Sequence, residues 1–147
     1  MFDMSGYNDY QQLITKPINL SILLKYILCT ENESPRNLYF CLFVDDLLQS
    51  NEKKETQLKW MYELHTTFLM SASAPLKLKN VSEAACRRLE EAFERAPLDN
   101  IAQMRKLLDD IKQEAVDVVN SQLARFREVK QLGKSSSLYI PTKYSFN

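Results

Sequence analysis

The chain contains only two glycine residues, Gly6 and Gly133, and this scarcity narrows the folds open to it. Tight hairpin turns between β-strands depend on glycine, and so do the loops that wrap nucleotide phosphates. An all-β fold and a glycine-rich nucleotide site are therefore disfavoured, and the chain is predicted to be all-α. Its 147 residues are enough for one domain with one hydrophobic core.

Charge is balanced over the chain, with 19 basic and 19 acidic residues. A balanced chain exerts no net attraction on nucleic acid or on an anionic membrane surface, so neither is expected as a partner. The longest apolar run, 18–29, contains Lys25 and is shorter than the roughly 20 residues of a membrane-spanning helix. Residues 1–10 lack the pattern of a signal peptide, so we expect a cytoplasmic protein without direct membrane insertion.

The three cysteines, Cys29, Cys41 and Cys86, are far apart in the sequence and lie in apolar helical segments. An odd number of cysteines at such spacing does not suggest a disulfide framework. We interpret them as reduced thiols in the core of an intracellular protein.

Apolar residues recur at helical spacing in five segments, and signals for helix starts precede them. In the second segment, Ser34 and Pro35 supply a cap and a first-turn proline. In the fourth, Asn80 and Glu83 form a capping box. The last segment is longer than most globular helices, so a kink or break is expected within it. The helices are expected to start near Asn19, at Pro35, after Asn51, at Asn80 and at Pro97, with the break between Asp109 and Val119 and the last end at Gly133.

The segment from Pro35 to Gln49 is apolar on most faces and is expected to be the central, most buried helix. Its predicted inward residues are Leu38, Phe40, Leu42, Phe43 and Leu47. Deep burial is expected of Leu38, Leu42 and, in the last helix, Phe126. Residues 1–16 and 134–147 flank the helical domain 17–133 and hold six of the fifteen aromatic residues. Because disordered linkers are poor in aromatics, at least part of these flanks is expected to pack on the bundle or on a partner.

Side chains with catalytic potential are few and badly spaced for catalysis. His65 is the single histidine, and Glu63 lies on another face of a helix, so a structural histidine is favoured over a catalytic one. No group of Cys and His has the short spacing of a zinc site. Adjacent acidic residues, such as Asp45 and Asp46, point apart on a helix and are interpreted as solvated charges. We therefore expect no metal, no cofactor and no active site, and the residues alone indicate a helical interaction module.

Two segments of the chain resemble the regulator of G protein signalling (RGS) fold. Residues 23–47 (LLKYILCTENESPRNLYFCLFVDDL) contain the family's Ser-x-x-Asn-Leu-x-Phe pattern at Ser34, Asn37, Leu38 and Phe40. Residues 119–132 (VNSQLARFREVKQL) carry a small polar residue followed by Arg-Phe, at Ser121, Arg125 and Phe126.

Within that family, the order of segments is most similar to the RGS-like domain of certain Rho guanine-nucleotide exchange factors. A Leu-rich first helix, a Pro-opened second helix, a Tyr/Phe-rich third helix and the loop PLKLKN at 75–80 follow one another. The resemblance covers residues 17–133 and implies an RGS-like bundle of about eight or nine helices, short segments included. It also implies a partner, the activated α subunit of a heterotrimeric G protein. That partner would recruit the chain to the plasma membrane and link it to Rho through the exchange factor's other domains.

The resemblance assigns a partner-binding surface to three parts of the chain. Asn37 would contact a switch segment of the α subunit. Ser121 and Arg125 would support that surface from the last helix. Lys77 and Lys79, in the loop 71–79, would complete it. For the two lysines, a role as solubilising loop charges is the alternative.

The N-terminal segment bears on GTP hydrolysis. In the Rho exchange-factor branch, a densely acidic and aromatic segment before the helical domain accelerates hydrolysis by the α subunit. Here Asp9 and Tyr10 are the nearest match, and Asp3 is the only other acidic residue within 1–13. Weak or absent GTPase acceleration is therefore expected.

The sequence departs from the RGS pattern at three further positions, which keeps other interpretations open. Arg36 stands where the family has an acidic residue, the last helix lacks the family's acidic residue near Asn120, and Ala124 stands where the family has a proline. The alternatives are an RGS-like adaptor of a trafficking protein and a generic helical scaffold or dimerisation domain. An enzyme with its own active site is the least favoured interpretation.

Overall fold

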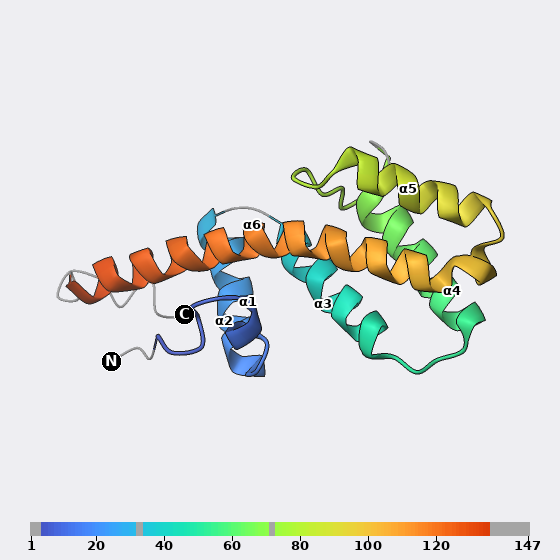
Figure 1. The fold of residues 1–147 in the computed structure, drawn as a ribbon. Helices are drawn as coiled ribbons and strands as arrows, with labels where there is room; N and C mark the ends of the chain where they lie inside the picture. Colours follow the sequence, from blue (N-terminus) through green and yellow to red (C-terminus); the bar gives the residue numbers. More distant parts are fainter. Residues whose placement is uncertain (1–3, 32–33, 71–72, 136–147) are drawn as a thin grey trace. The chain divides into compact units, whose positions relative to one another are not determined.

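The computed structural model describes residues 4–31, 34–70 and 73–135, and within them the chain is helical and has no β-strand (Figure 1). The all-α prediction is confirmed for these residues. They contain six α-helices, fewer than the eight or nine expected. The π-helical turns η1 (Ile27–Glu31) and η2 (His65–Leu69) continue α2 and α4 without a break, and the 3-10 turn η3 (Pro97–Asn100) leads directly into α6.

The helices group into two compact units, and each is described by itself. The internal unit is Pro35–Val118. The terminal unit combines the described parts of Met1–Ser34 and Val119–Asn147. Helix α6 (Ile101–Ser135) contributes its first part to the internal unit and its last part to the terminal unit.

The internal unit is built from α3 (Arg36–Gln49), α4 (Lys54–Leu64), η2, α5 (Glu83–Glu94), η3 and the first part of α6. Apolar side chains at helical spacing on each helix face inward and bury their surface, which is the main favourable term in folding. The buried residues include Leu38, Phe40, Val44, Met61, Phe68, Leu89, Met104, Leu108 and Ile111. The predicted deep burial of Leu38 is confirmed.

Two side chains of α3 that were expected to point inward do not. Leu42 is only half-buried, and the Phe43 side chain is 51% exposed. The prediction was wrong because α3 is apolar around most of its circumference, whereas a helix buries only the faces that have neighbours. The number and position of those neighbours are set by the tertiary fold and leave no mark on the helix's own sequence.

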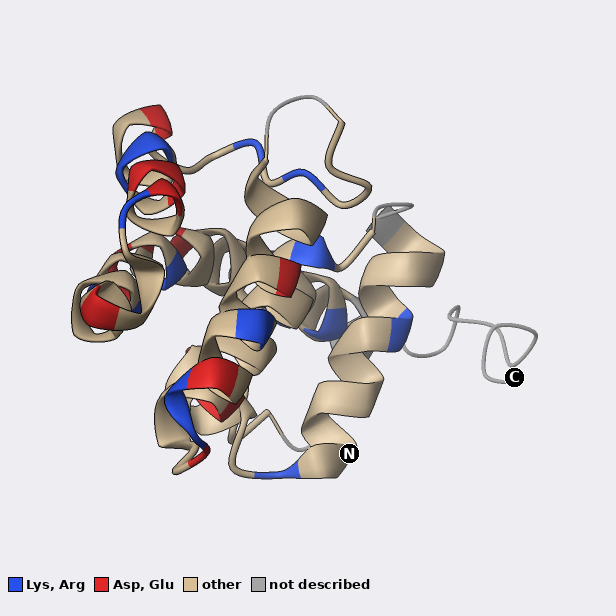
Figure 2. Ribbon diagram, turned by 90° about the vertical axis from the view of Figure 1, so that its right-hand side faces the viewer, with Lys and Arg blue, Asp and Glu red and all other residues tan. Residues whose placement is uncertain are grey.

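Polar contacts attach α6 to α3 within the internal unit. Lys112 donates a hydrogen bond to Asp45, and both side chains are largely buried. Asp45 is therefore half of a buried ion pair and not the solvated charge that was expected. Arg105 donates to the carbonyl oxygens of Leu47 and Leu48, at 3.2 and 2.7 Å, and so satisfies carbonyls in the last turn of α3. Elsewhere in this unit, basic and acidic residues are interspersed along the helices (Figure 2).

The terminal unit contains α1 (Tyr10–Leu13), α2 (Pro17–Tyr26), η1 and the last part of α6. Its core is aromatic: the ring of Phe126 lies 5.0 Å from that of Tyr7 and 5.2 Å from that of Tyr26, between centroids. The predicted deep burial of Phe126 is confirmed, and so is the packing of N-terminal aromatics, since Tyr7 and Tyr10 are buried. The other flanking aromatics, Phe2, Tyr139, Tyr144 and Phe146, lie outside the described residues.

Three helix starts differ from those expected. Helix α3 begins at Arg36, and its cap position is held by Pro35 and not by Ser34. Helix α2 begins at Pro17, and Asn19 is a buried residue within it rather than its cap. Helix α5 begins at Glu83, and its cap is Ser82, whose hydroxyl oxygen accepts a hydrogen bond from the Ala85 amide at 3.1 Å. Asparagine and serine are both good caps, so the sequence did not determine which one starts the helix.

Helix α6 is continuous from Ile101 to Ser135, so the expected break between Asp109 and Val119 is absent. Sharp kinks come from proline, from glycine and serine pairs or from inserted side chains, and residues 101–132 contain neither proline nor glycine. Gly133 is a helical residue here and does not end the helix.

Candidate functional site

The start of α3 and the segment 73–82 form one corner of the internal unit, which we call the α3 corner. The Nη1 group of Arg36 donates a hydrogen bond to the carbonyl oxygen of Lys77 at 3.0 Å. The same segment pairs with η2 through its backbone, because the amides of Leu76 and Leu78 donate to the carbonyls of Thr67 and Phe68, each at 2.9 Å. The segment is therefore fixed against both α3 and η2.

Lys77 serves this corner as an internal tether. Its Nζ donates to the Leu69 carbonyl at 2.7 Å and lies 4.0 Å from a carboxylate oxygen of Glu83. Lys79 is exposed and is the cation that the corner presents to solvent. Ser71 and Ala72, the first residues of the predicted loop 71–79, lie outside the described residues.

Asn37 is the second residue of α3 and is half-buried. Its Oδ1 atom is buried and has no hydrogen-bond partner among the described residues. A buried acceptor without a donor costs about 1–3 kcal/mol relative to a satisfied one. Because this atom is covered in the free chain, a donor from a partner could satisfy it only after a local rearrangement at the start of α3.

The sequence-predicted residues near the N-terminus lie in the terminal unit, where both have roles in the fold. The Asp9 carboxylate caps α1 by accepting a hydrogen bond from the Gln12 amide at 2.9 Å. Tyr10 is fully buried, and its amide donates to Oδ1 of Asn120 at 2.9 Å. The ring of Tyr10 is therefore a core group and is not available for direct contact with a partner.

Ser121 and Arg125 are exposed and lie one turn apart on α6, on the same face of the helix. Close to them, Arg127 donates from Nη1 to the carbonyl oxygens of Tyr7 and Asn8, at 2.6 and 3.0 Å. These bonds hold the N-terminal segment against α6. Sequence reasoning missed Arg127 because its partners are backbone carbonyls, which every residue possesses.

The predicted site residues thus fall into two groups. The internal unit carries Asn37, Lys77 and Lys79, and the residue before Asn37, Arg36, is hydrogen-bonded to the carbonyl oxygen of Lys77. The terminal unit carries the other four, Asp9, Tyr10, Ser121 and Arg125.

His65 lies in an aromatic cluster of the internal unit. Its ring centroid is 5.3 Å from that of Phe93 and 6.3 Å from that of Tyr62, and its Nε2 is 4.0 Å from a carboxylate oxygen of Glu90. Burial lowers the pKa of His65 below its ordinary value, against a smaller upward effect of Glu90. A buried, neutral imidazole among aromatic rings is a packing residue, which agrees with the structural role predicted for it.

The three thiols differ in their surroundings. Burial raises the pKa of Cys41 to about 12 and also raises the pKa of Cys86, so both thiols remain protonated at neutral pH. Cys29 is exposed in η1, contrary to the expectation of a core thiol.

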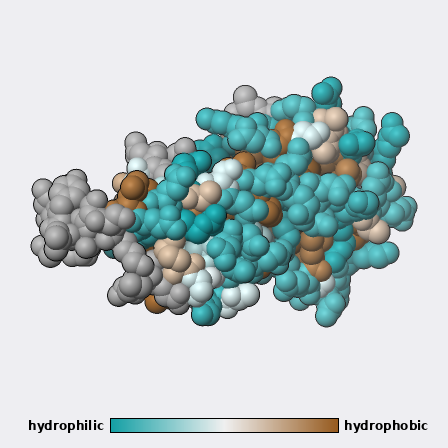
Figure 3. All heavy atoms as spheres, turned by 60° about the vertical axis from the view of Figure 1, so that its left-hand side comes forward, coloured by the Kyte–Doolittle hydropathy of each residue, from teal (hydrophilic) through white to brown (hydrophobic). Residues whose placement is uncertain are grey.

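Among the described residues, no three His, Cys, Asp or Glu side chains gather as metal ligands would, and no helix is long and apolar enough to cross a membrane. The face drawn in Figure 3 is mostly hydrophilic, with hydrophobic residues in small separate areas.

Comparison with known proteins gives one match. The family model of the regulator of G protein signalling-like domain matches residues 3–139, which covers the described parts of both units. No curated protein and no solved structure matches the chain. The match includes the α3 corner with Asn37 and the α6 face with Arg125, the two places that the sequence motifs had singled out. The chain therefore belongs to the regulator of G protein signalling-like family.

Proposed function

We propose that the chain binds the activated α subunit of a heterotrimeric G protein, as the regulatory module of a Rho guanine-nucleotide exchange factor. The observation that carries the proposal is the Asn37 amide at the α3 corner. It stands at the position that the sequence resemblance to the family assigns to a switch contact, and its buried Oδ1 has no hydrogen-bond partner among the described residues. A switch segment of the α subunit that donates to Oδ1 would satisfy it.

The α3 corner also accounts for the unusual Arg36. An ionised acidic residue at this position could not donate to a carbonyl oxygen, whereas Arg36 donates a hydrogen bond to the Lys77 carbonyl. The corner therefore keeps a fixed shape before a partner arrives, which lowers the entropy cost of binding.

Weak or absent GTPase acceleration is part of the proposal. Such modules act by holding the switch loops of the α subunit in place and donate no chemical group of their own. The two N-terminal residues that best matched an accelerating segment are occupied in the fold, since Asp9 caps α1 and Tyr10 is buried. Because both residues have these roles in the fold, they support a chain that binds the α subunit without strongly accelerating GTP hydrolysis.

Capture of purified α subunits tests the binding. The immobilised chain should retain an α subunit loaded with GDP and aluminium fluoride, and should retain the same subunit loaded with GDP alone much less. Asn37→Ala and Arg125→Glu should each weaken the capture at least about fivefold, roughly 1 kcal/mol, which is the worth of one hydrogen bond or rim contact. Asn51→Ala and Arg87→Glu make the same changes of residue type at exposed positions of the internal unit and are the controls.

Retention that ignores the nucleotide would contradict the proposal and favour a generic scaffold. Retention that survives both substitutions would place the interface elsewhere. Unchanged far-UV circular dichroism of each variant separates a lost contact from a lost fold.

A further inference from the structure

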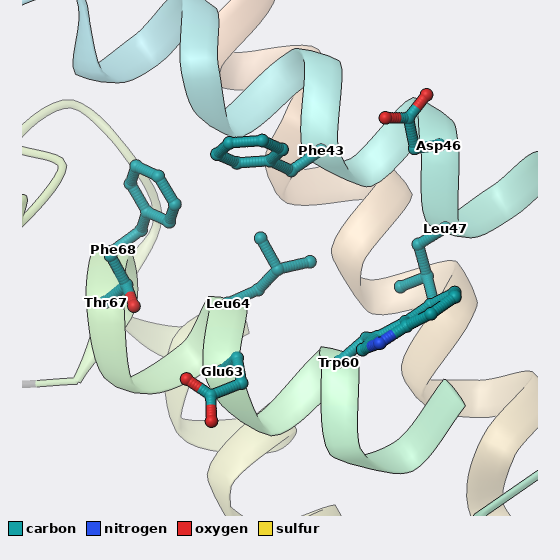
Figure 4. Close-up of a pocket in the computed structure, with 8 residues that line it drawn as sticks. All are labelled: Phe43, Asp46, Leu47, Trp60, Glu63, Leu64, Thr67 and Phe68. Atoms are coloured by element: carbon teal, nitrogen blue, oxygen red, sulfur yellow. The ribbon is translucent and has the colours of Figure 1, made fainter. Parts of the chain in front are cut away.

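An apolar groove runs between α3 and α4 of the internal unit, and at its η2 end it adjoins the segment 73–82, which pairs with Thr67 and Phe68. Its walls are two ridges at helical spacing: Phe43 and Leu47 on α3, and Trp60, Leu64 and Phe68 on α4 and η2 (Figure 4). The groove encloses about 380 Å³, which is within the usual range of ligand-sized pockets. Along α4 and η2 it runs from Trp60 to Phe68, eight residue steps or about 12 Å, roughly two helical turns.

Large aromatic side chains are left open to solvent in this groove. Phe43 is 51% and Trp60 is 41% exposed, although Phe40 and Phe68 on the same elements are buried. Leaving the apolar surface of tryptophan and phenylalanine in water is unfavourable compared with burying it. Tryptophan is also among the residues most enriched at the energetic centres of interfaces. Covering the groove with another apolar surface is therefore favourable in free energy.

The charge of the rim indicates what covers it. Asp46 comes from α3 and Glu63 from α4, so one carboxylate stands beside each ridge (Figure 4). Both residues are exposed, and neither side chain has an ion-pair or hydrogen-bond partner among the described residues. No basic residue lines the groove. An anionic lipid surface would be repelled by this rim, whereas a segment with cationic flanks would be attracted.

We propose that the α3–α4 groove is a second docking site, which takes a short amphipathic helix of another protein with bulky apolar side chains on one face and Lys or Arg beside them. A helix of this kind places apolar residues at i and i+4 on one line, which matches a groove of two turns. Its apolar residues pack between Phe43 and Trp60, and its cations lie against Asp46 and Glu63. The site is independent of the proposed binding of the α subunit.

The groove can be tested with a synthetic helical peptide and the chain's single tryptophan. Because Trp60 is the only tryptophan, its fluorescence reports occupancy of the groove directly. The probe is an amphipathic peptide free of Trp and Tyr, with Leu at i, i+4 and i+7 and Lys on both flanks. A second peptide has Glu in place of every Lys. The Lys peptide should shift the Trp60 emission to shorter wavelength and bind at least about tenfold more tightly than the Glu peptide.

Charge exchange on the protein provides the sharper comparison. The double variant Asp46→Lys/Glu63→Lys should reverse the preference, so that the Glu peptide binds more tightly. Glu91→Lys/Glu94→Lys, on exposed positions of α5, makes the same change in net charge elsewhere and should leave the preference intact. Near 1 M salt, where the screening length is about 3 Å, the difference in affinity between the Lys peptide and the Glu peptide should become smaller.

The apolar walls have their own matched pair of variants. Phe43→Ser should weaken binding of the Lys peptide at least about fivefold. Leu98→Ser, at an exposed apolar residue of η3, should leave that binding unchanged. Circular dichroism of all variants checks that the helices are retained.

Three results would overturn the proposal. Equal binding of the two peptides would mean unspecific apolar contact. A preference that survives Asp46→Lys/Glu63→Lys would place the peptide outside the groove. A Trp60 emission shift that follows the concentration of the chain alone, with dimers in sedimentation, would show that a second copy fills the groove.

Discussion

Lys112 and Asp45 show how much a single pair of side chains can contribute in this fold. Their side chains are 7% and 16% exposed, so water cannot replace a lost partner. Removing one member of such a pair leaves the other charge in a poorly solvated place without its closest counter-charge, which costs about 3–5 kcal/mol. Lys106 and Asp110, on the same helix, form a pair of the same type in full contact with solvent.

We predict that Lys112→Met lowers the free energy of unfolding by about 3–5 kcal/mol. Lys106→Met, the matched control, should change it by less than about 1 kcal/mol. The loss of unfolding free energy in the double variant Asp45→Ala/Lys112→Met should be much smaller than the summed losses of Asp45→Ala and Lys112→Met, because neither charge of the pair remains. Urea denaturation followed by circular dichroism measures all four. Additive losses would argue that the two side chains do not depend on each other.

His65 makes the stability of the internal unit depend on pH. Burial lowers its pKa in the folded chain below the ordinary value of 6.5, so the unfolded chain binds the proton more readily. The contribution of the neutral imidazole is complete above that ordinary value and is lost as the pH falls below it.

We therefore predict that the free energy of unfolding decreases between about pH 7 and pH 5. In His65→Leu, which keeps an apolar side chain of similar size and cannot titrate, the decrease over this interval should be smaller. Urea titrations at several pH values compare the two chains. An identical slope in both would assign the pH dependence to other groups.

At the scale of single elements, the continuity of α6 is the feature with the widest consequences. One unbroken helix supplies Arg105 and Lys112 to the internal unit and Phe126 and Arg127 to the terminal unit. The helix that joins these two groups of residues depends on an uninterrupted series of backbone hydrogen bonds through residues 109–119.

A proline in that stretch should break the ladder. Gln113 is exposed, so Gln113→Pro changes the backbone without disturbing the core, and it should cost about 3 kcal/mol or more. Gln113→Ala should be neutral or slightly stabilising because alanine favours helix. Thermal unfolding followed by circular dichroism at 222 nm, the usual helix band, measures the difference. A Gln113→Pro chain as stable as the Gln113→Ala chain would mean that α6 tolerates a break.

At the scale of the whole molecule, the proposed function is to bind the α subunit without strongly accelerating its GTP hydrolysis. An RGS-like module that preorganises the switch loops lowers the barrier of hydrolysis only if its contacts favour the transition state over the ground state. In this chain Asp9 caps α1 and Tyr10 belongs to the core.

We predict that single-turnover GTP hydrolysis by a preloaded α subunit is accelerated less than about tenfold by the chain, or about 1.4 kcal/mol of transition-state stabilisation. The capture assay on the same preparations should show binding. A larger acceleration that depends on residues 1–13 would contradict this prediction. Because Tyr7 and Tyr10 belong to the core, that dependence is better tested with Asp3→Asn and Asp9→Asn than by deleting the segment.

The sequence by itself determined the fold class and the family. The lack of glycine and the helical spacing of apolar residues specified helices and most of their ranges, since these depend on the backbone and on neighbours three or four residues away. The motif around Asn37 and the Arg125-Phe126 pair pointed to the family that the family match then identified.

Only the tertiary structure decided which faces of those helices are covered and what the polar side chains bind. Asp45, Tyr10 and Lys77 each resembled a surface group in the sequence, yet each is committed to a contact at least eight residues away along the chain. Phe43 was expected in the core and instead forms one wall of an open groove. Local spacing fixes the side of the helix on which a side chain stands. Whether another element packs against that side depends on residues distant in the sequence, so the interaction surfaces of this chain are properties of the assembled fold.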